Sequence, residues 1–273
     1  MRWEGPHRAL GRSEVIALGT LLLVATAQRA WNACTLPPLT GYDAPGHAGY
    51  ILTIVAEHRL PHPLEGWSTF HPPAYYLLAS LVWRLLEPFG PRTIDAGIRA
   101  IGSLAGIGAG LVSYLLVRRL GGSPRVAWVA AALVLFVPCA QLAAAMEGNE
   151  ALAAGLAALA LPGLVTLQRN PRRLRAAAAS GLFTGLALAT KFSALPLLAA
   201  CAVPFARADA DRAALRTAAV MAVAGLLVAG PVYLRNISLT GSLVPMTRDI
   251  GPMRKAEANL VLRPRLIRDY LWI

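Results

Sequence analysis

Apolar residues fall into long runs along the chain, separated by short polar or arginine-containing segments. Most runs approach the length that a helix needs to cross the apolar core of a bilayer. The pattern therefore predicts an all-α, polytopic membrane protein with seven spans. The predicted spans are Val15–Ala27 with a weaker extension to Ala33, Ile98–Val117, Val126–Ala145, Ala151–Leu167, Ala176–Thr190, Ser193–Ala206 and Thr217–Leu234.

Two of these assignments have alternatives. The first run is short, and Ala25-Thr26-Ala27 resembles a signal-peptide cleavage site, although the later runs favour a membrane anchor. The runs on either side of Lys191 are also short, so they fit two spans, a short hairpin or one long helix. Small-residue repeats, Gly102-Gly106-Gly110 and Gly181-Gly185, predict close helix contacts.

Between about residues 34 and 97 the apolar continuity is lost, and proline and histidine become frequent. We expect a long structured loop here, with helices over Ala44–His58 and Ala74–Leu86 lying at the membrane interface. The whole chain, residues 1–273, is expected to be one membrane-embedded domain.

Arginines concentrate in alternate connections between the apolar runs. Positively charged loops stay in the cytoplasm, and Arg2, Arg8 and Arg12 precede the first apolar run. The pattern therefore predicts a protein of the plasma or inner membrane with a cytoplasmic N-terminus. The same parity places the 34–97 loop, the Met146–Glu150 turn, Lys191 and Arg235 together on the outer face.

Composition agrees with a membrane protein. The 273 residues are 56% hydrophobic and 15% charged, with a net charge of +12. The arginines lie between apolar runs and not along an aromatic-rich face, which argues against a nucleic-acid partner and for membrane lipids. Three scattered cysteines indicate neither a disulfide framework nor a zinc site.

Asp43 is the first catalytic candidate, because a carboxylate in an outer loop can act as a general base. Asp43 also precedes Ala44-Pro45, which is the pattern of a helix N-cap followed by a first-turn proline. The local sequence leaves both roles open.

The loop holds His47, His58, His62 and His71. Pro61 interrupts any helix that would align His58 with His62, and the other spacings match no compact ligand pattern, so a divalent metal is not supported and no cofactor is predicted. His47 follows Asp43 by one helical turn and is a candidate to orient that carboxylate or a substrate group.

Four more residues are candidates for the outer site. Glu147 and Glu150 fit either helix-start acids or a second carboxylate that faces Asp43. Lys191 and Arg235 are cations at the predicted outer ends of spans, where they could bind the phosphate of a lipid-linked substrate.

These residues stand in an order that resembles the C-type membrane glycosyltransferases, which include protein O-mannosyltransferases and the bacterial aminoarabinose transferase. The resemblance spans nearly the whole chain. It rests on Tyr42-Asp43-Ala44-Pro45-Gly46-His47, Leu60-Pro61, His71-Pro72-Pro73-Ala74-Tyr75-Tyr76, Asn149-Glu150, Thr190-Lys191-Phe192-Ser193 and Tyr233-Leu234-Arg235-Asn236.

The resemblance implies sugar transfer from a polyprenyl-phosphate donor to a hydroxyl of a protein, lipid or cell-envelope glycan. It implies that Asp43 deprotonates the acceptor while Lys191 and Arg235 stabilise the leaving phosphate. We assign catalysis to Asp43 and Glu150, and substrate binding to His47, His71, Glu147, Lys191, Arg235 and Asn236.

Two features depart from that family. Many relatives have a second acid after the loop aspartate, where this chain has Ala44, and relatives carry further C-terminal spans. The alternative functions are a transporter or flippase, which would place polar residues and broken helices inside the membrane, and an inactive truncated membrane fragment.

Overall fold

The computed structural model describes residues 10–41, 43–206 and 211–245, and within them all regular structure is helical, which confirms the all-α prediction. Two short 3-10 turns, Glu87–Phe89 and Phe192–Ala194, accompany the helices. The α-helices are α1 (Arg12–Thr35), α2 (Ala44–Glu57), α3 (Ala74–Leu86), α4 (Pro91–Arg119), α5 (Pro124–Phe136), α6 (Pro138–Ala145), α7 (Glu150–Arg169), α8 (Leu174–Thr190), α9 (Pro196–Ala202) and α10 (Arg212–Thr240).

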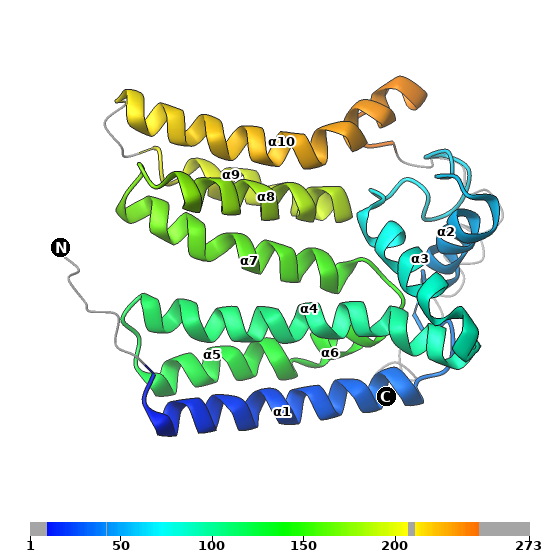
Figure 1. Ribbon diagram of the computed structural model, residues 1–273, viewed down its shortest axis with the longest axis horizontal. Coiled ribbons are helices and arrows are strands. Elements are labelled where there is room, and N and C mark those ends of the chain that lie inside the picture. The colour runs from blue at the N-terminus through cyan, green and yellow to red at the C-terminus, as the bar shows by residue number, and fades with distance from the viewer. Residues whose placement is uncertain (1–9, 42, 207–210, 246–273) are drawn as a thin grey trace, which may run out of the picture.

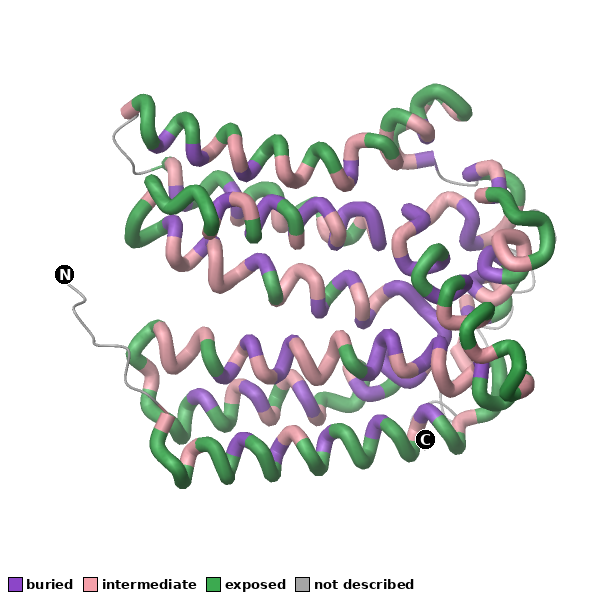
Figure 2. The backbone as a smooth tube through the Cα atoms, viewed as in Figure 1, coloured by how far each residue is buried: buried purple, intermediate pink, exposed green. Residues whose placement is uncertain are grey.

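The long helices lie roughly parallel or antiparallel in a bundle, and α2 and α3 cover one end of it (Figure 1). Exposed residues run along the outer faces of α1 and α10 (Figure 2). Many of them are apolar, including Leu227 on α10, which is 73% exposed. An apolar outer face of this kind is what lipid contact requires.

Among the described residues, three helices are long and apolar enough to cross a membrane, namely α4, α7 and α10. The pair α5 and α6 qualifies as a fourth span that bends by 50° at the break before Pro138. Helices α8 and α9 are shorter apolar helices of 17 and 7 residues. Integral membrane character is therefore supported, while the count of seven spans stays a prediction.

The α5–α6 bend exists because Pro138 has no backbone N–H to continue the helix. The carbonyl of Leu135, in the last turn of α5, instead accepts hydrogen bonds from Arg29 Nη2 at 3.2 Å and Gln141 Nε2 at 2.5 Å. The bend lets α6 end beside the middle of α4, where Ser103 donates to the Ala144 carbonyl at 3.2 Å. It thereby positions the turn that follows α6.

The predicted packing glycines do allow close helix contacts. A Cβ at Gly181 on α8 would lie 2.1 Å from the carbonyl oxygen of Met221 on α10, and one at Gly185 would lie 2.6 Å from that of Gly225. Only glycine permits backbones to approach this closely. This contact holds α10 against α8, so that the end of α10 reaches the capped end of the bundle (Figure 1).

The two ends of the bundle differ as parity predicted. One end collects the connections rich in arginine, where Arg118 pairs with Glu14 at 2.8 Å and Arg169 donates to the Arg119 carbonyl at 3.0 Å. The other end carries α2, α3 and the ends of α6, α8 and α10 (Figure 1). Arg2 and Arg8 lie outside the described residues, and which end faces the cytoplasm stays a prediction.

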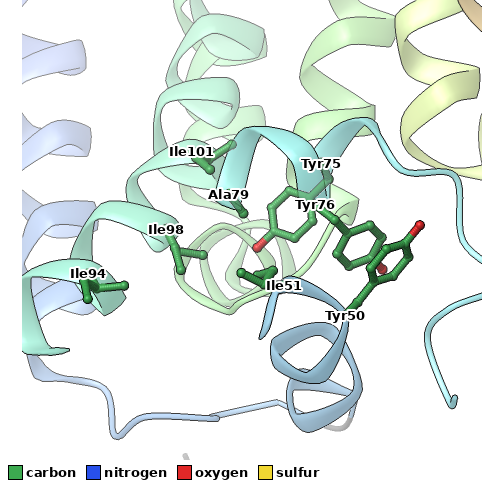
Figure 3. Packing of buried hydrophobic residues seen from close by; sticks show 8 residues of the cluster. All are labelled: Tyr50, Ile51, Tyr75, Tyr76, Ala79, Ile94, Ile98 and Ile101. Carbon is green, nitrogen blue, oxygen red and sulfur yellow. The ribbon is translucent and has the colours of Figure 1, made fainter. Parts of the chain in front are cut away.

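The two predicted loop helices are present as α2 and α3, with bounds within one residue of the expected ones. The apolar stripe of α2 does not face outward, because Tyr50 and Ile51 are buried against α3 and α4 (Figure 3). The cluster consists of Tyr50, Ile51, Tyr75, Tyr76, Ala79, Ile94, Ile98 and Ile101. This cluster holds α2 and α3 together beside α4 and so supports the polar residues at the start of each helix. The predicted position of α2 and α3 at the membrane interface stays a prediction.

Candidate functional site

Asp43 occupies the N-cap position of α2, but its side chain accepts no capping hydrogen bond from that helix. Its Oδ2 instead lies 3.1 Å from Nε2 of His47, one turn further along. The carboxylate is about one-quarter exposed, whereas His47 is fully buried. Of the two roles that the local sequence left open, the capping bond is not formed, and the carboxylate is held at the edge of the site by His47.

His47 is held from its other side by α3. Its Nδ1 lies 2.6 Å from the hydroxyl of Tyr76, and its ring stacks on the rings of Tyr76 and His71, with centroid distances of 5.6 Å in both cases. Tyr76 in turn stacks on Tyr50 at 3.7 Å. The imidazole therefore has little freedom to rotate, and it presents Nε2 to Asp43.

The surroundings keep Asp43 ionised. The hydrogen bond from His47 is the largest influence and lowers the pKa of Asp43, burial opposes it, and the charge of Lys191 adds to the lowering. Burial lowers the pKa of His71 to about 3, with His47 and Lys191 contributing in the same direction. At neutral pH the site thus holds a carboxylate base and an uncharged His71 imidazole.

Glu150 and Lys191 form an ion pair at the same site. Glu150 begins α7 and Lys191 directly follows α8, and the side-chain amide of Asn149 joins these two ends by donating to the Thr190 carbonyl at 3.2 Å. A Cβ at Gly148 would lie 2.5 Å from Glu150 Oε2 and 3.8 Å from His47 Nε2. The Glu150 carboxylate and the His47 ring therefore flank Gly148.

Glu147 belongs to a different cluster. It lies 4.0 Å from Nη2 of Arg99 and shares a hydrogen bond with Asp95, and both partners are on α4. Burial and Asp95 raise the pKa of Glu147 to about 7. Arg99 is buried and donates to the Leu36 carbonyl at 2.7 Å. This cluster anchors the start of the long loop. Glu147 therefore contacts α4 and Glu150 contacts Lys191, and the predicted site roles of both glutamates stay predictions.

A mostly apolar cavity of about 830 Å³ lies beside this second cluster and is lined by both Asp95 and Glu147. Its other walls come from the end of α1, the segment 36–39, α2, α3 and the start of α4. The buried Tyr75 feels the charges of both Glu147 and Glu150, so it lies within electrostatic reach of both clusters.

The two candidates at the end of α10 have separate contacts. Arg235 Nη2 donates to the carbonyl of Pro61 at 2.6 Å, which ties the long loop to α10, and its charge acts on Tyr50 within the site. Asn236 is buried and donates to the Leu243 carbonyl at 3.2 Å. That bond explains Asn236 by local structure, and its predicted role in substrate binding stays a prediction.

A second cavity, of about 580 Å³, runs between α8, α9 and α10, and its lining is almost entirely apolar. It extends from Met221 to Tyr233, whose ring meets that of Phe192 at 5.8 Å. Phe192 follows Lys191 in sequence, so the apolar cavity ends close to the cationic part of the site.

Three side chains of the site could hold a metal ion. Asp43, His47 and His71 each offer one ligand atom, and these atoms all lie within 4.8 Å of one another. In the sequence, the spacings of Asp43 and the four loop histidines match no compact ligand pattern, so a metal site was not supported there. The available signal was the helical spacing of Asp43 and His47, but the addition of His71 depends on the fold. Sequence reasoning also missed Tyr76 and Gly148.

Comparisons with known proteins bear on the family and fold of the chain. A family model described as dolichyl-phosphate-mannose-protein mannosyltransferase matches residues 70–234, which include His71, Glu150 and Lys191 but not Asp43 or His47. No curated protein sequence matches the chain.

One similar solved structure is that of the Archaeoglobus fulgidus oligosaccharyltransferase in the apo form. It has 19% sequence identity and a TM-score of 0.56 over 93% of this chain. The chain spans only 38% of the length of that enzyme. The family match and this likeness together support the C-type glycosyltransferase fold.

Proposed function

Because the chain belongs to the dolichyl-phosphate-mannose-protein mannosyltransferase family, we propose that it is an integral membrane glycosyltransferase with the C-type fold. It transfers a sugar from a polyprenyl-phosphate donor to an acceptor hydroxyl on the extracytoplasmic side. The observation that carries this proposal is the Asp43 carboxylate, which is free of helix capping, ionised, and oriented by a buried histidine.

In this reaction Asp43 accepts the proton of the acceptor hydroxyl as that oxygen attacks the anomeric carbon. The bond between the anomeric carbon and the phosphate oxygen breaks, and the lipid phosphate leaves with the bonding electrons. Attack from the face opposite the phosphate inverts the configuration. His47 acts on the base itself, since its contact with Asp43 at 3.1 Å fixes the carboxylate orientation.

The leaving phosphate needs positive charge nearby. Lys191 supplies it from the end of α8, where Glu150 holds the ammonium group in place. Arg235 supplies a second cation from α10, and its bond to the Pro61 carbonyl keeps the guanidinium beside the long loop. Glu150 forms an ion pair with Lys191, so the role of Glu150 is to position the Lys191 ammonium group.

The apolar cavity between α8, α9 and α10 supports a lipid-linked donor. A polyprenyl chain loses contact with water when it enters such a cavity, at a gain of about 25 cal/mol for each Å² of apolar surface. The cavity approaches Lys191 through Phe192 and Tyr233, so a chain seated there brings its phosphate toward the cations. The acceptor hydroxyl belongs to a protein, a lipid or a cell-envelope glycan.

The test uses membranes that contain the protein and a panel of radiolabelled polyprenyl-phosphate sugars. We expect Asp43→Asn to lower transfer by a factor of about 10² to 10⁴, the usual contribution of a general base. The matched control is Glu65→Gln, which changes an acid of the same loop that pairs with Arg59 on the surface. Undiminished transfer by Asp43→Asn would refute the assignment of the base.

A transporter or flippase is a second candidate, and one observation favours it. Arg29 is buried in the bundle beside the broken helix pair α5–α6. Its Nη2 donates to the Leu135 carbonyl at 3.2 Å, while its Nε and Nη1 find no hydrogen-bond partner among the described residues. Charged side chains and helix breaks inside a membrane are frequent in transporters. Substrate uptake into vesicles that survives Asp43→Asn and is lost in Arg29→Met would establish this alternative.

A further inference from the structure

We propose that Asp43, His47 and His71 bind one divalent transition-metal ion, with Zn²⁺ as the best-matched ion. This inference goes beyond the proposed function and does not depend on it, because the three side chains converge whatever reaction follows. Two of them come from the start of α2 and the third from the segment before α3, so the fold, and not local sequence, assembles the set.

The distances suit a single ion. Zn²⁺ lies about 2.0 to 2.2 Å from nitrogen and oxygen ligands, so two ligand atoms along a tetrahedral edge are about 3.4 Å apart. His47 Nε2 and Asp43 Oδ2 are 3.1 Å apart, and the third atom lies within 4.8 Å of both. A movement of the His71 ring by no more than about 1.4 Å completes the triangle.

His47 already has the support that a metal-binding histidine needs. A ligating imidazole commonly hydrogen-bonds through its other nitrogen, which fixes the ring. Here Nδ1 is held by the Tyr76 hydroxyl at 2.6 Å, and that hydroxyl can either donate or accept. With a metal on Nε2, Nδ1–H donates to Tyr76; without a metal, Tyr76 donates and Nε2–H faces Asp43.

His71 has a buried polar atom that the protein leaves without a partner. Its Nδ1 makes no hydrogen bond, although buried polar groups almost always make one. The ring stacks on His47 with an interplanar angle of 21°, so the two imidazoles share one edge of the site. A bound ion at that edge would give the ring the polar partner that it lacks.

Ligand type selects the class of ion. Two imidazoles and one carboxylate favour Zn²⁺ or another transition metal, because Mg²⁺ and Ca²⁺ prefer oxygen ligands. The charge of Lys191 opposes a nearby cation, but Glu150 neutralises it through their ion pair. Three protein ligands leave at least one position open for a substrate oxygen.

The metal would act together with the proposed base. An acceptor hydroxyl in the open position is acidified by the ion. Asp43 has two carboxylate oxygens, so one can ligate the metal while the other accepts the hydroxyl proton. His47 would then hold the metal in addition to orienting Asp43.

The test measures binding on purified, metal-free protein in detergent, with no sugar donor present. Zn²⁺ affinity is measured by competition with a chromophoric chelator, and Co²⁺ is added as a coloured probe of coordination. We expect about one Zn²⁺ per chain, visible Co²⁺ absorption that Zn²⁺ abolishes, and no competition from millimolar Mg²⁺. We expect His71→Gln and Asp43→Asn to weaken Zn²⁺ binding at least about tenfold.

His58→Asn is the matched control, because His58 is an exposed histidine of the same loop that contacts Arg84. Equal Zn²⁺ affinity in wild type and His71→Gln would overturn the proposal. So would a wild-type dissociation constant weaker than about 10 μM, a result that requires no variant to fold. Because no donor is present, failure of metal binding leaves the proposed transfer reaction intact, and failure of transfer leaves the binding result intact.

Discussion

The hydroxyl of Tyr76 lies 2.6 Å from Nδ1 of His47, on the opposite side of the imidazole from Asp43. Burial raises the pKa of Tyr76 well above its ordinary value, so the hydroxyl keeps its proton at neutral pH. The Asp43 carboxylate can only accept a proton at Nε2, so in the metal-free protein a neutral His47 carries its proton on Nε2 and accepts at Nδ1 from the Tyr76 hydroxyl. Tyr76 therefore positions the Asp43 carboxylate through His47.

Tyr76→Phe removes the hydroxyl that holds His47 and keeps the aromatic ring that stacks on Tyr50. We expect the rate constant kcat for sugar transfer to fall about tenfold with little change in KM for the donor, because the base and not the donor contacts are altered. The unpaired Nδ1 of the fully buried His47 should also cost about 1 to 3 kcal/mol of unfolding free energy. Steady-state kinetics and thermal unfolding in detergent measure the two effects.

Tyr114→Phe is the control for this substitution. It also removes one tyrosine hydrogen bond, the 2.9 Å contact with Glu14, but at the opposite end of the bundle. It should lower the melting temperature and leave kcat unchanged. Equal kcat in wild type and Tyr76→Phe would show that the hydroxyl has no positioning role.

The Gly148→Ala variant tests whether the Glu150 carboxylate must keep its present position near His47. An alanine Cβ there would lie 2.5 Å from Glu150 Oε2, and the flexible carboxylate can move away without a change of fold. We therefore expect Gly148→Ala to keep the wild-type melting temperature within a few degrees. Transfer should fall about tenfold or more, since Glu150 no longer holds Lys191 in its present place.

Gly49→Ala is the matched control, because no atom lies within 4 Å of the Cβ that it would add on α2. This variant should transfer sugar at the wild-type rate. Full activity of Gly148→Ala, with the same folding yield as the control, would mean that the Glu150–Lys191 pair tolerates displacement.

The helices beside the site could be predicted from the sequence because they carry local signals. Asp43 followed by Pro45 marks the start of α2, and Pro73 precedes α3. Apolar runs and alternate arginine-rich connections were sufficient to gather Glu150, Lys191 and Arg235 at one end of the bundle (Figure 1). These features depend on residues that are close in sequence or on the length of a run.

Side-chain directions could not be predicted in the same way. Glu147 and Glu150 are three residues apart, yet one pairs with Asp95 and the other with Lys191. The turn between α6 and α7 has no periodicity that would have separated them. The convergence of His71 on His47 likewise results from packing of α2 against α3, which the sequence does not specify.

The second acidic cluster predicts a pH dependence of stability. The pKa of Glu147 is raised from 4.5 to about 7 by burial and by Asp95. Between these values the folded protein keeps a proton on Glu147 that the unfolded chain has lost. The folded state then binds more protons than the unfolded state, so the free energy of unfolding falls as pH rises through this window.

Glu147→Gln removes the titrating proton and should flatten this dependence. We expect the melting temperature of wild type to fall between pH 5 and pH 7.5 by on the order of 5 °C more than that of Glu147→Gln. Glu65→Gln is the control, because Arg59 lowers the pKa of Glu65 to about 2 and that carboxyl is ionised in both states across the window. The control should keep the wild-type slope. Only a group whose pKa differs between the folded and unfolded states can make stability depend on pH. If Glu147→Gln keeps the wild-type pH dependence, the proton must therefore be bound by a residue other than Glu147.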